Sequence, residues 1–423
     1  MKTKFLLSYI FGLLWLAVSF WFAIFWAGEL TTVWPAWYVW GVVGGIALLP
    51  GFLMSSMFFS NLLHRKVRQY PDTAESVTVI MCAHNEEEQI AGTIRAVLNQ
   101  RYRGCIRLLV VDNASTDGTR GEILLQKAYA DGCRRRLEYL YCGKKGKAHA
   151  LNCALKRVCT KHFITVDADT YLEKQAVQKI MNHICACQSG CVADNLFVKN
   201  PRASLAAAMQ NYDYLLSIAA VKRFQGSYRS TLVAQGAFSA YDTVAVRQVG
   251  GWKDVLGEDI VLTYQLLEKG FGSEYQAAAV GYTTVPETIS GLYNQRKRWA
   301  VGMLEGLSTV RPWQQGSIYS RHFSLVNLSV IWLDLAFLFG FVPGLLLAAL
   351  GYFYLAGCLT LTTLAVCLVF FLSTYLYQKQ LHIPFYNSVW GFVWFLAVFQ
   401  MIQSTAAIHG YLFRLLHRKG EWK

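Results

Sequence analysis

The stretch Phe163-Ile164-Thr165-Val166-Asp167-Ala168-Asp169 decides the fold class of this chain. Its first four residues form a short apolar run of the kind that makes a buried strand, and two carboxylates follow at once. Because side chains alternate along a strand and Ala168 keeps the bend tight, Asp167 and Asp169 can both face a crevice at the strand's carboxyl end. Such a pair of oxygen ligands suits Mg²⁺ or Mn²⁺ shared with substrate phosphates.

Three earlier apolar runs predict three more strands, at residues 77–82, 106–111 and 137–141. An amphipathic helix pattern begins at Ile90, after the first run, and another begins at Ala148, after the third. This alternation predicts an α/β domain with a mostly parallel sheet, whose ligands bind at the carboxyl ends of the strands.

Polar side chains follow each predicted strand. Asn85 and Glu86 close the first strand, and Asp112 follows the second. Lys147 comes after the third, in a Gly-Lys-Lys-Gly-Lys turn, and the aspartate pair comes after the fourth. One such cluster would be an ordinary cap or turn. Four clusters at one sheet edge favour a nucleotide site, since they combine acceptors for a base and ribose with a cation for phosphate and carboxylates for a metal.

The composition is that of an integral membrane protein, with 54% hydrophobic residues and a mean hydropathy of +0.29. Two uncharged stretches, Phe5 to Gly28 and Leu30 to Leu63, each exceed the roughly 20 residues that cross a bilayer as a helix. Lys2 and Lys4 precede the first stretch, and basic residues at 64–68 follow the second. The positive-inside rule therefore predicts a hairpin with both ends in the cytoplasm, and a cytosolic central region.

The C-terminal region predicts two or three further spans. Residues 323–377 carry one charge, Asp334, and are long enough for two spans, while residues 381–413 supply a third that a basic tail follows. Two plus three spans would place that tail outside, against the charge rule. Four or five spans therefore stay open, with a re-entrant or interfacial segment at Val342-Pro343-Gly344 or in the polar stretch 400–405.

Polar residues interrupt these apolar segments: Asn327, Asp334, Gln400, Gln403 and His409. Polar groups inside a span cost free energy unless they face the bundle interior. They either line a path for a polar product or form hydrogen bonds between packed helices, and both interpretations stay open.

The net charge of +14 does not indicate a nucleic-acid partner. Basic residues gather partly at 64–68, 296–298 and 414–419, beside apolar segments, and contact with anionic lipid explains such clusters. We therefore expect the lipid bilayer, and no nucleic acid, as a partner.

Four neighbouring residues resemble zinc ligands only superficially: His183, Cys185, Cys187 and Cys191. Their spacing lacks the paired C-x-x-C of zinc sites, so we interpret them as buried or incidental thiols.

Two further motifs lie downstream, Gly257-Glu258-Asp259 and Gln295-x-x-Arg298-Trp299. Together with the strand-end clusters, they make the sequence resemble the membrane-embedded, processive family 2 glycosyltransferases, which include synthases of cellulose, chitin, hyaluronan and poly-N-acetylglucosamine. The resemblance covers the N-terminal hairpin, the central domain and the C-terminal spans. It implies a GT-A nucleotide-sugar domain, a UDP-sugar donor, Mg²⁺ or Mn²⁺ as cofactor, and a growing polysaccharide as acceptor.

The resemblance also implies roles for single residues. Asp169 would hold the metal with Asp167 assisting, and Trp299 and Gly236 would lie on the acceptor side. Gly236 would act through its backbone, in a segment that also includes Arg247. The donor nucleotide would be bound by Asn85, Glu86, Asp112, Lys147, Asp167, Gln295 and Arg298.

Sugar transfer with inversion needs a general base at the acceptor, opposite the leaving diphosphate. Glu258 and Asp259 open a predicted helix, and a carboxylate at such a helix start can project into the cleft. We therefore expect Asp259 to be the catalytic base, with Glu258 beside it as a metal-shell or lysine-pairing group.

Gln295 and Arg298 share one face of a helix because they are three residues apart. Arg298 can bind the diphosphate with its planar donors and stabilise the charge of the leaving group. Trp299 offers a flat apolar surface to the acceptor sugar. The segment can also anchor in lipid, a role that Arg296 and Lys297 fit better.

The expected organisation is a transmembrane hairpin (1–68), a cytosolic GT-A domain (69–290), interfacial helices with the QxxRW motif (291–322) and a C-terminal transmembrane bundle (323–423). The expected enzyme lies in the inner cell membrane and polymerises UDP-N-acetylglucosamine into an extracellular β-1,6-linked polysaccharide of the biofilm type, which it translocates. Accessory membrane or export subunits are further expected partners.

Two alternatives remain. One is a single-transfer enzyme acting on a membrane lipid, since ceramide glucosyltransferases also carry the Arg-Trp motif. The other is a non-catalytic membrane receptor or assembly subunit that keeps the nucleotide fold.

Overall fold

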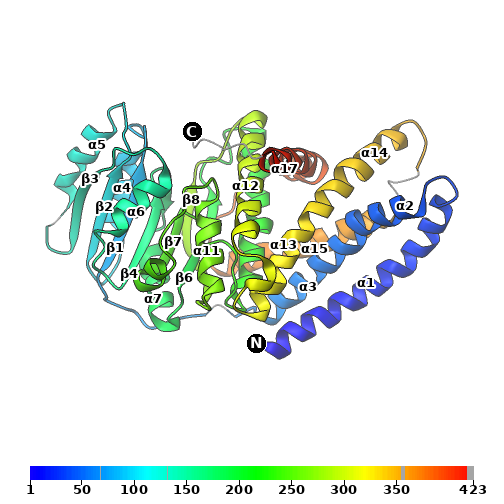
Figure 1. The fold of residues 1–423 in the computed structure, drawn as a ribbon, viewed down its shortest axis with the longest axis horizontal. Helices are drawn as coiled ribbons and strands as arrows, with labels where there is room; N and C mark the ends of the chain where they lie inside the picture. The colour runs from blue at the N-terminus through cyan, green and yellow to red at the C-terminus, as the bar shows by residue number, and fades with distance from the viewer. Residues whose placement is uncertain (67, 131, 354–357, 417–423) are drawn as a thin grey trace.

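The computed structural model describes residues 1–66, 68–130, 132–353 and 358–416. Figure 1 shows two parts side by side, with strands and short helices at one end and long helices at the other. Within the described residues, the α/β part holds one eight-stranded sheet of order β3-β2-β1-β4-β7-β6-β8-β5.

All four strands predicted from apolar runs are present, each extended by one or two residues. The strands are β1 Val77–Ala83, β2 Ile106–Asp112, β3 Arg135–Tyr141, β4 His162–Asp167, β5 Tyr171–Leu172, β6 Cys191–Val198, β7 Phe238–Asp242 and β8 Ser273–Thr283. The helices around them are α4 Ile90–Leu98, α5 Thr119–Leu125, α6 Lys147–Leu155, α7 Ala176–Cys187, α8 Leu205–Asp213, α9 Val221–Gly226, α10 Thr243–Gln248 and α11 Glu258–Glu268.

The sheet is mixed, but four of its seven strand pairings are parallel, in agreement with the prediction of a mostly parallel sheet. Strands β3, β2, β1 and β4 are parallel, as are β6 and β8. Strand β7 is antiparallel to both β4 and β6, and β5 is antiparallel to β8. The strand–helix alternation that predicts parallel pairing ends at β4, and the helical segment before β7 returns the chain to the sheet in the opposite direction.

Strand β1 explains why the first half of the sheet is readable from sequence. Val79 and Met81 lie in one core with α4, while Ile80 lies in the other core with α6. All three side chains are fully buried. A strand covered on both faces is apolar at every position, and its sequence is therefore a continuous hydrophobic run.

The other part consists of long helices. They are α1 Lys2–Leu30, α2 Ala36–Val43, α3 Leu49–Leu63, α12 Ile289–Thr309, α13 Ile318–Ala336, α14 Val342–Ala349, α15 Cys358–Gln380, α16 Val389–Trp394 and α17 Gln400–Leu415. Short π-helical turns continue α2 into α3, α13 into α14, and α16 into α17. Among the described residues, four continuous stretches are long and apolar enough to cross a membrane: Lys2–Leu30, Ala36–Leu63, Ile318–Ala349 and Val389–Leu415.

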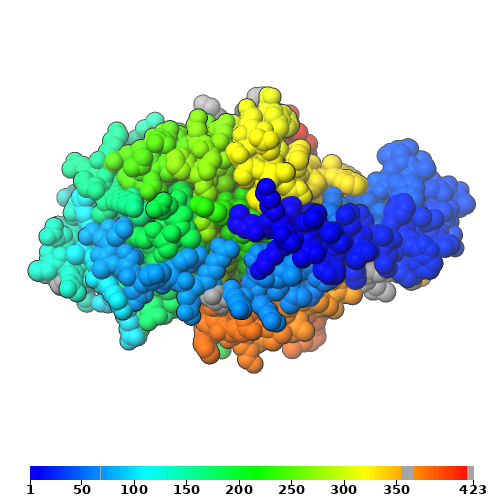
Figure 2. Space-filling model, turned by 90° about the horizontal axis from the view of Figure 1, so that it is seen from below, coloured from blue at the N-terminus to red at the C-terminus, as the bar shows by residue number. Residues whose placement is uncertain are grey.

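The first two of these stretches form a hairpin. Lys4 Nζ donates to the carbonyl of Leu63 at 2.8 Å, so the start of α1 and the end of α3 lie together. Figure 2 shows α1 on the outside of the helical part, and its Leu13, Trp21 and Phe25 side chains are more than half exposed. An outward face of this kind suits contact with lipid chains.

The last stretch has a different direction from the others. Figure 1 shows α17 almost along its own axis, whereas α1, α3, α13 and α15 run across the picture. Helix α15 packs on α3, and α17 packs on α12 and α13. The stretch Val389–Leu415, which left the number of spans open, therefore crosses the helix bundle instead of running alongside it.

Three of the five polar residues inside the apolar segments form hydrogen bonds to other helices. Asp334 accepts from the hydroxyls of Ser404 and Tyr411, both at 2.7 Å. Asn327 donates to Tyr264 at 3.2 Å, and His409 lies 2.9 Å from the Tyr293 hydroxyl. These contacts favour helix packing over a product path as the role of these residues.

Helices α11 and α12 touch backbone to backbone. A Cβ at Gly257 would lie 2.4 Å from the Cα of Gly302, and one at Gly302 would lie 2.8 Å from the Cα of Gly257. The Gly257 amide also donates to Glu305 Oε2 at 2.9 Å. The start of α11 is therefore fixed against the helix that carries Gln295 to Trp299.

Gly302→Ala should separate α11 from α12, because the added methyl group overlaps the Gly257 backbone. We expect a destabilisation of about 1–3 kcal/mol, the usual cost of overpacking. The melting temperature of the purified protein in detergent measures it. Gly92→Ala is the control, since nothing lies within 4 Å of its added Cβ and alanine favours the helix. Equal melting temperatures for the two variants would contradict the close contact.

Candidate active site

The polar clusters predicted at the strand ends do lie at one edge of the sheet. In the parallel register, Asp112 is level with Ala83, and Asp167 is level with Cys82. The carboxyl ends of β1, β2 and β4 therefore meet, as the parallel arrangement of these strands requires.

Asn85 and Asp112 shape the loop after β2. Asn85 has a positive φ of 57°, and its side-chain oxygen accepts from the Thr116 amide at 2.8 Å. Asp112 accepts from the Ser115 amide and from the Tyr139 hydroxyl, both at 2.9 Å. Each acceptor is thus partly used in holding the loop, and its remaining lone pairs are available to a ligand.

Lys147 opens α6 and lies between two carboxylates. Its Nζ is 2.5 Å from Asp167 Oδ1 and 3.8 Å from Glu258 Oε1. Burial alone would lower the pKa of Lys147, but Asp167 and Glu258 raise it above its usual value. The lysine is therefore a fixed positive charge at the end of β4.

Asp169 has no cationic partner of its own in the described structure. Its oxygens accept from the hydroxyls of Thr170 at 3.2 Å and Thr283 at 3.5 Å. Burial, and then the charge of Asp167, raise the pKa of Asp169. Burial, followed by Asp169 and Asp167, also raises the pKa of Glu86 to about 7.

This excess of negative charge fits a divalent cation. Asp167, Asp169 and Glu86 offer hard oxygen atoms, and one lysine offsets only part of their charge. Mg²⁺ and Mn²⁺ prefer such ligands. Bound there, the cation would lower the pKa values of these carboxyl groups.

Asp259 lies in the first turn of α11 and points toward the same edge. Its Oδ2 accepts from the Gly236 amide at 3.1 Å, and its Oδ1 accepts from the Ile260 amide at 2.8 Å. A Cβ at Gly236 would lie 2.9 Å from Lys147 Nζ. Gly236 therefore lies between Lys147 and Asp259 with no room for a side chain. Its contact with Asp259 is made by the backbone amide, which is consistent with the backbone role expected for it.

Glu258 is buried beside Lys147. Burial raises its pKa, the lysine opposes this effect, and Asp259 adds to it. Of the two roles expected for Glu258, the geometry shows the pairing with lysine.

The motif on α12 lies close to this edge. Trp299 is half-buried and packs on the same apolar cluster as Ala237, whose carbonyl accepts from the Asp167 amide at 3.0 Å. Arg298 and Gln295 are half-buried as well. The structure therefore brings the aspartate pair, Asp259 and Trp299 into one region.

Two expectations from sequence are wrong. Arg296 does not face lipid: it is 4% exposed, lies 2.7 Å from Asp213, and its guanidinium stacks 4.0 Å from the Trp299 ring. Arg247 does not lie on the acceptor side, since it donates to the carbonyls of Leu155 and Val158 behind α6. A carboxylate binds the guanidinium of Arg296, and two backbone carbonyls bind that of Arg247. These partners are distant in the chain, so the local sequence does not reveal them.

Sequence reasoning also missed a buried polar cluster behind Asp259. Asp194 is fully buried and accepts from Gln235 at 2.6 Å, while Lys222 is 5% exposed. Burial raises the pKa of Asp194 to about 7 and lowers that of Lys222 to about 8, where Asp194 and Asp259 partly oppose it. A charged residue inside the apolar run of β6 was the available signal.

Two groups of potential metal ligands occur among the described residues. Glu75, His162 and Cys185 form one, and His183, Cys187 and Glu274 form the other. The four residues close in sequence therefore do not share one site.

A family model described as "Glycosyltransferase like family 2" matches residues 74–302, more than half of the chain. The chain belongs to this family. Its domain has the GT-A fold, and with it the expectations of fold and enzyme class are confirmed.

Relatives of this glycosyltransferase include the poly-β-1,6-N-acetyl-D-glucosamine synthase of Staphylococcus aureus strain COL, 28% identical over 283 residues, or 66% of this chain and 67% of that protein. The synthase of the same name from Staphylococcus epidermidis is 28% identical over 301 residues, 70% of each chain. Among solved structures, the mannosyltransferase PcManGT from Pyrobaculum calidifontis, in complex with GDP-Man and Mn²⁺, aligns with a TM-score of 0.55 at 19% identity. It covers 88% of this chain and 99% of its own, and supports the fold alone.

Glu86→Gln should change how stability depends on pH when divalent cations are chelated. A carboxyl group whose folded pKa, here about 7, exceeds its unfolded value binds its proton more tightly when folded. The free energy of unfolding therefore falls as pH rises from about 4.5 to about 7. The variant lacks the titrating carboxyl group, so its stability does not fall for this reason. Its melting temperature should exceed that of the wild type at pH 8, with the gain shrinking toward pH 5.

The control is Glu88→Gln, which alters an exposed neighbour. A constant difference between Glu86→Gln and the wild type across this pH range would show that Glu86 does not titrate in this way.

Proposed function

We propose that this family 2 glycosyltransferase is an inverting, processive enzyme that polymerises UDP-N-acetylglucosamine into a β-1,6-linked polysaccharide. The observation that carries the proposal is that the Lys147–Asp167 pair, Asp169, and Asp259 on Gly236 meet at one edge of the sheet. The names of the staphylococcal relatives support the sugar and the linkage.

In the proposed reaction, an acceptor hydroxyl attacks the anomeric carbon of the donor sugar, and Asp259 takes the hydroxyl proton. The new glycosidic bond forms as the bond from that carbon to the diphosphate breaks on the opposite face, so the configuration inverts and UDP leaves. The hydrogen bonds from the Gly236 and Ile260 amides hold the base in place.

The remaining site residues bind and orient in this proposal. Asn85, Glu86 and Asp112 contact the nucleoside, and Gln295 and Arg298 approach the diphosphate from α12. Lys147 and Arg298 stabilise the negative charge on departing UDP, and Asp169 and Asp167 would hold the cation. When bound, Mg²⁺ or Mn²⁺ would neutralise part of the diphosphate charge.

The acceptor would lie against Trp299. One face of this ring carries the Arg296 guanidinium, which the buried Asp213 holds. Arg296 and Asp213 thus fix the orientation of the tryptophan, and we assign them this positioning role.

We further propose that the enzyme lies in the inner membrane with its catalytic domain in the cytoplasm. The N-terminal hairpin, α13–α14 and the 23-residue α15 would cross the bilayer. The stretch Val389–Leu415, although long enough to cross, would lie crosswise at the inner surface. This arrangement gives four spans and leaves the end of α17, with Arg414, on the cytoplasmic side, as the positive-inside rule requires. The domain limits expected from sequence, at 68, 290 and 322, remain part of this proposal.

A second candidate function is the transfer of a single sugar to a membrane lipid. It is favoured by the hydrogen bonds of Asp334, Asn327 and His409, which use these polar groups for helix packing. Translocation of a polymer, with or without accessory membrane or export subunits, would need a polar path that these residues do not supply.

Asp259→Asn should lower kcat by about 10²–10⁴-fold, because an amide cannot take the proton. Binding of UDP in the presence of Mn²⁺ should stay within about twofold of the wild type. Asp169→Asn should weaken that binding by at least about tenfold, because it removes a cation ligand. Radiolabelled sugar transfer measures kcat, and isothermal titration calorimetry measures the binding of UDP.

The matched control for these variants is Asp254→Asn, which changes an aspartate that is 68% exposed just before α11. Full activity of Asp259→Asn would remove the base from the proposal.

Incubation of the purified enzyme with single radiolabelled UDP-sugars and Mg²⁺ or Mn²⁺ should give incorporation from UDP-N-acetylglucosamine. Product sizing by gel filtration should show long chains early in the reaction, since a processive enzyme retains its product. A product carrying one sugar, extractable into organic solvent, would establish the lipid-transfer alternative instead.

A further inference from the structure

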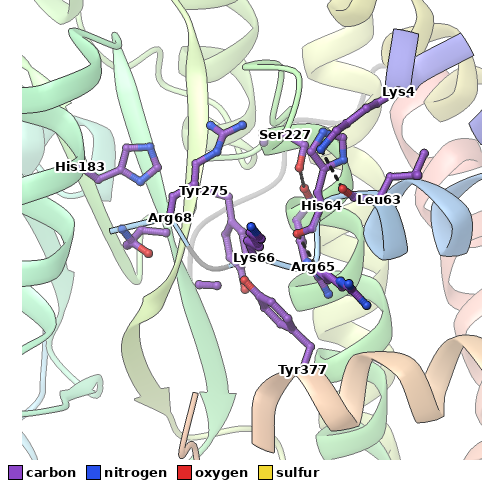
Figure 3. A pocket seen from close by; sticks show the side chains of 14 residues that line it. Lys4, Leu63, His64, Arg65, Lys66, Arg68, His183, Ser227, Tyr275 and Tyr377 are labelled. Atoms are coloured by element: carbon purple, nitrogen blue, oxygen red, sulfur yellow. Dashed lines mark hydrogen bonds between the residues drawn. The ribbon is translucent and has the colours of Figure 1, made fainter. Parts of the chain in front are cut away.

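A pocket of about 420 Å³ lies where the α/β part meets the long helices, away from the residues assigned to catalysis. Its walls come from the first turn of α1, the end of α3 and the linker that follows it, α7, α9, β8 and α15. Figure 3 shows Lys66 near the centre of the pocket, with Arg65 and Arg68 to either side.

The pocket is strongly basic. Its described lining contains no carboxylate and five cationic side chains: Lys4, Arg65, Lys66, Arg68 and Arg223. The nearby carboxylate of Glu274 is already shared, since it lies 3.0 Å from His183, 3.2 Å from Arg229 and 3.6 Å from Arg68. Arg65 and Lys66 are exposed, so the excess of positive charge faces the opening.

Arg223 is the buried centre of this charge. Its side chain is 7% exposed and forms no ion pair in the described structure. One nitrogen donates to the carbonyls of Asn61 at 2.7 Å and His64 at 3.1 Å, where the end of α3 offers partial negative charge. The guanidinium also stacks 3.4 Å from the Tyr377 ring.

Two donors in the wall remain unused. Arg223 Nε and the Tyr275 hydroxyl are buried and have no hydrogen-bond partner in the described structure. A buried cation without a counter-charge is costly, and an anion in the pocket would relieve that cost. Guanidinium and ammonium groups around one cavity are the usual way of binding phosphate oxygens.

We propose that this pocket binds the phosphodiester group of an anionic ligand. Its position favours a phospholipid of the inner leaflet as the source, because Lys4 lies in the first turn of the first apolar helix, and Arg65 and Lys66 come two and three residues after the end of the second. Juxtamembrane cations at this level meet lipid headgroups first. The pocket would thus hold one lipid headgroup between the membrane helices and strand β8.

The test measures binding to the full-length protein in dodecyl maltoside by microscale thermophoresis. Three probes are compared: dioctanoyl phosphatidylglycerol, the chain-free headgroup glycerophosphoglycerol, and zwitterionic dioctanoyl phosphatidylcholine. The double variant Arg65→Gln/Lys66→Gln removes two exposed charges without touching the core. Arg223→Gln removes the buried charge, and the melting temperature shows whether it folds.

We expect phosphatidylglycerol to bind the wild type, and both variants to weaken that binding by at least about tenfold. The matched control Lys156→Gln/Arg157→Gln removes two exposed charges from the α/β part and should change it less than about twofold. A second pair of variants makes the same comparison within the first turn of α1. Lys4→Gln should weaken binding and Lys2→Gln should not, because of these two lysines Lys4 lines the pocket in the described structure and Lys2 does not.

Binding of phosphatidylglycerol alone supports a lipid source, and equal binding of glycerophosphoglycerol supports a soluble phosphodiester. Unchanged affinity in Arg65→Gln/Lys66→Gln would overturn the proposal. It would also be overturned by an equal loss in the control double variant, or by phosphatidylcholine binding as tightly as phosphatidylglycerol, because either result would mean that no specific anion site exists. None of these readouts depends on sugar transfer, so the proposed function can fail without affecting this test.

Discussion

The active edge of this protein depends on the placement of one lysine among several carboxylates. Lys147 contacts Asp167 on β4 and Glu258 on α11, two elements that are far apart in the chain. Without that charge, the carboxylates at the strand ends would repel one another, and Glu258 at the start of α11 would lose its cationic partner. The close approach of Gly236 to Lys147 depends on the same arrangement.

The sequence predicts those parts of the fold whose signals are local. Strand β1 is apolar at nearly every position because both its faces are buried, and the strand–helix alternation up to β4 fixes the parallel half of the sheet. The antiparallel entry of β7 has no such signal, since it depends on how the helical segment before it turns back. The number of spans stayed open between four and five for a similar reason, because length and hydropathy do not reveal that α17 lies across the bundle.

The candidate site shows the same division. Asp167, Asp169 and Asp259 were recognisable because motif spacing places them at strand and helix ends. Asp194 and Lys222 were not, because their importance comes from burial beside each other and not from any local pattern. Arg296 illustrates the opposite error, since a basic residue beside an apolar segment resembles a lipid anchor until its partner Asp213, more than eighty positions earlier, is known.

Helix α9 follows directly on the π-helical turn Tyr214–Ala220. Two consecutive residues of α9, Lys222 and Arg223, point to different parts of the molecule. One lies near Asp194, and the other lies at the end of α3. Inserting or deleting one residue in the preceding turn would rotate α9 by about 100° and exchange the surroundings of the two cations. The number of residues between α8 and α9 is therefore under tighter constraint than their identity, and homologues should vary there by substitution and not by changes in length.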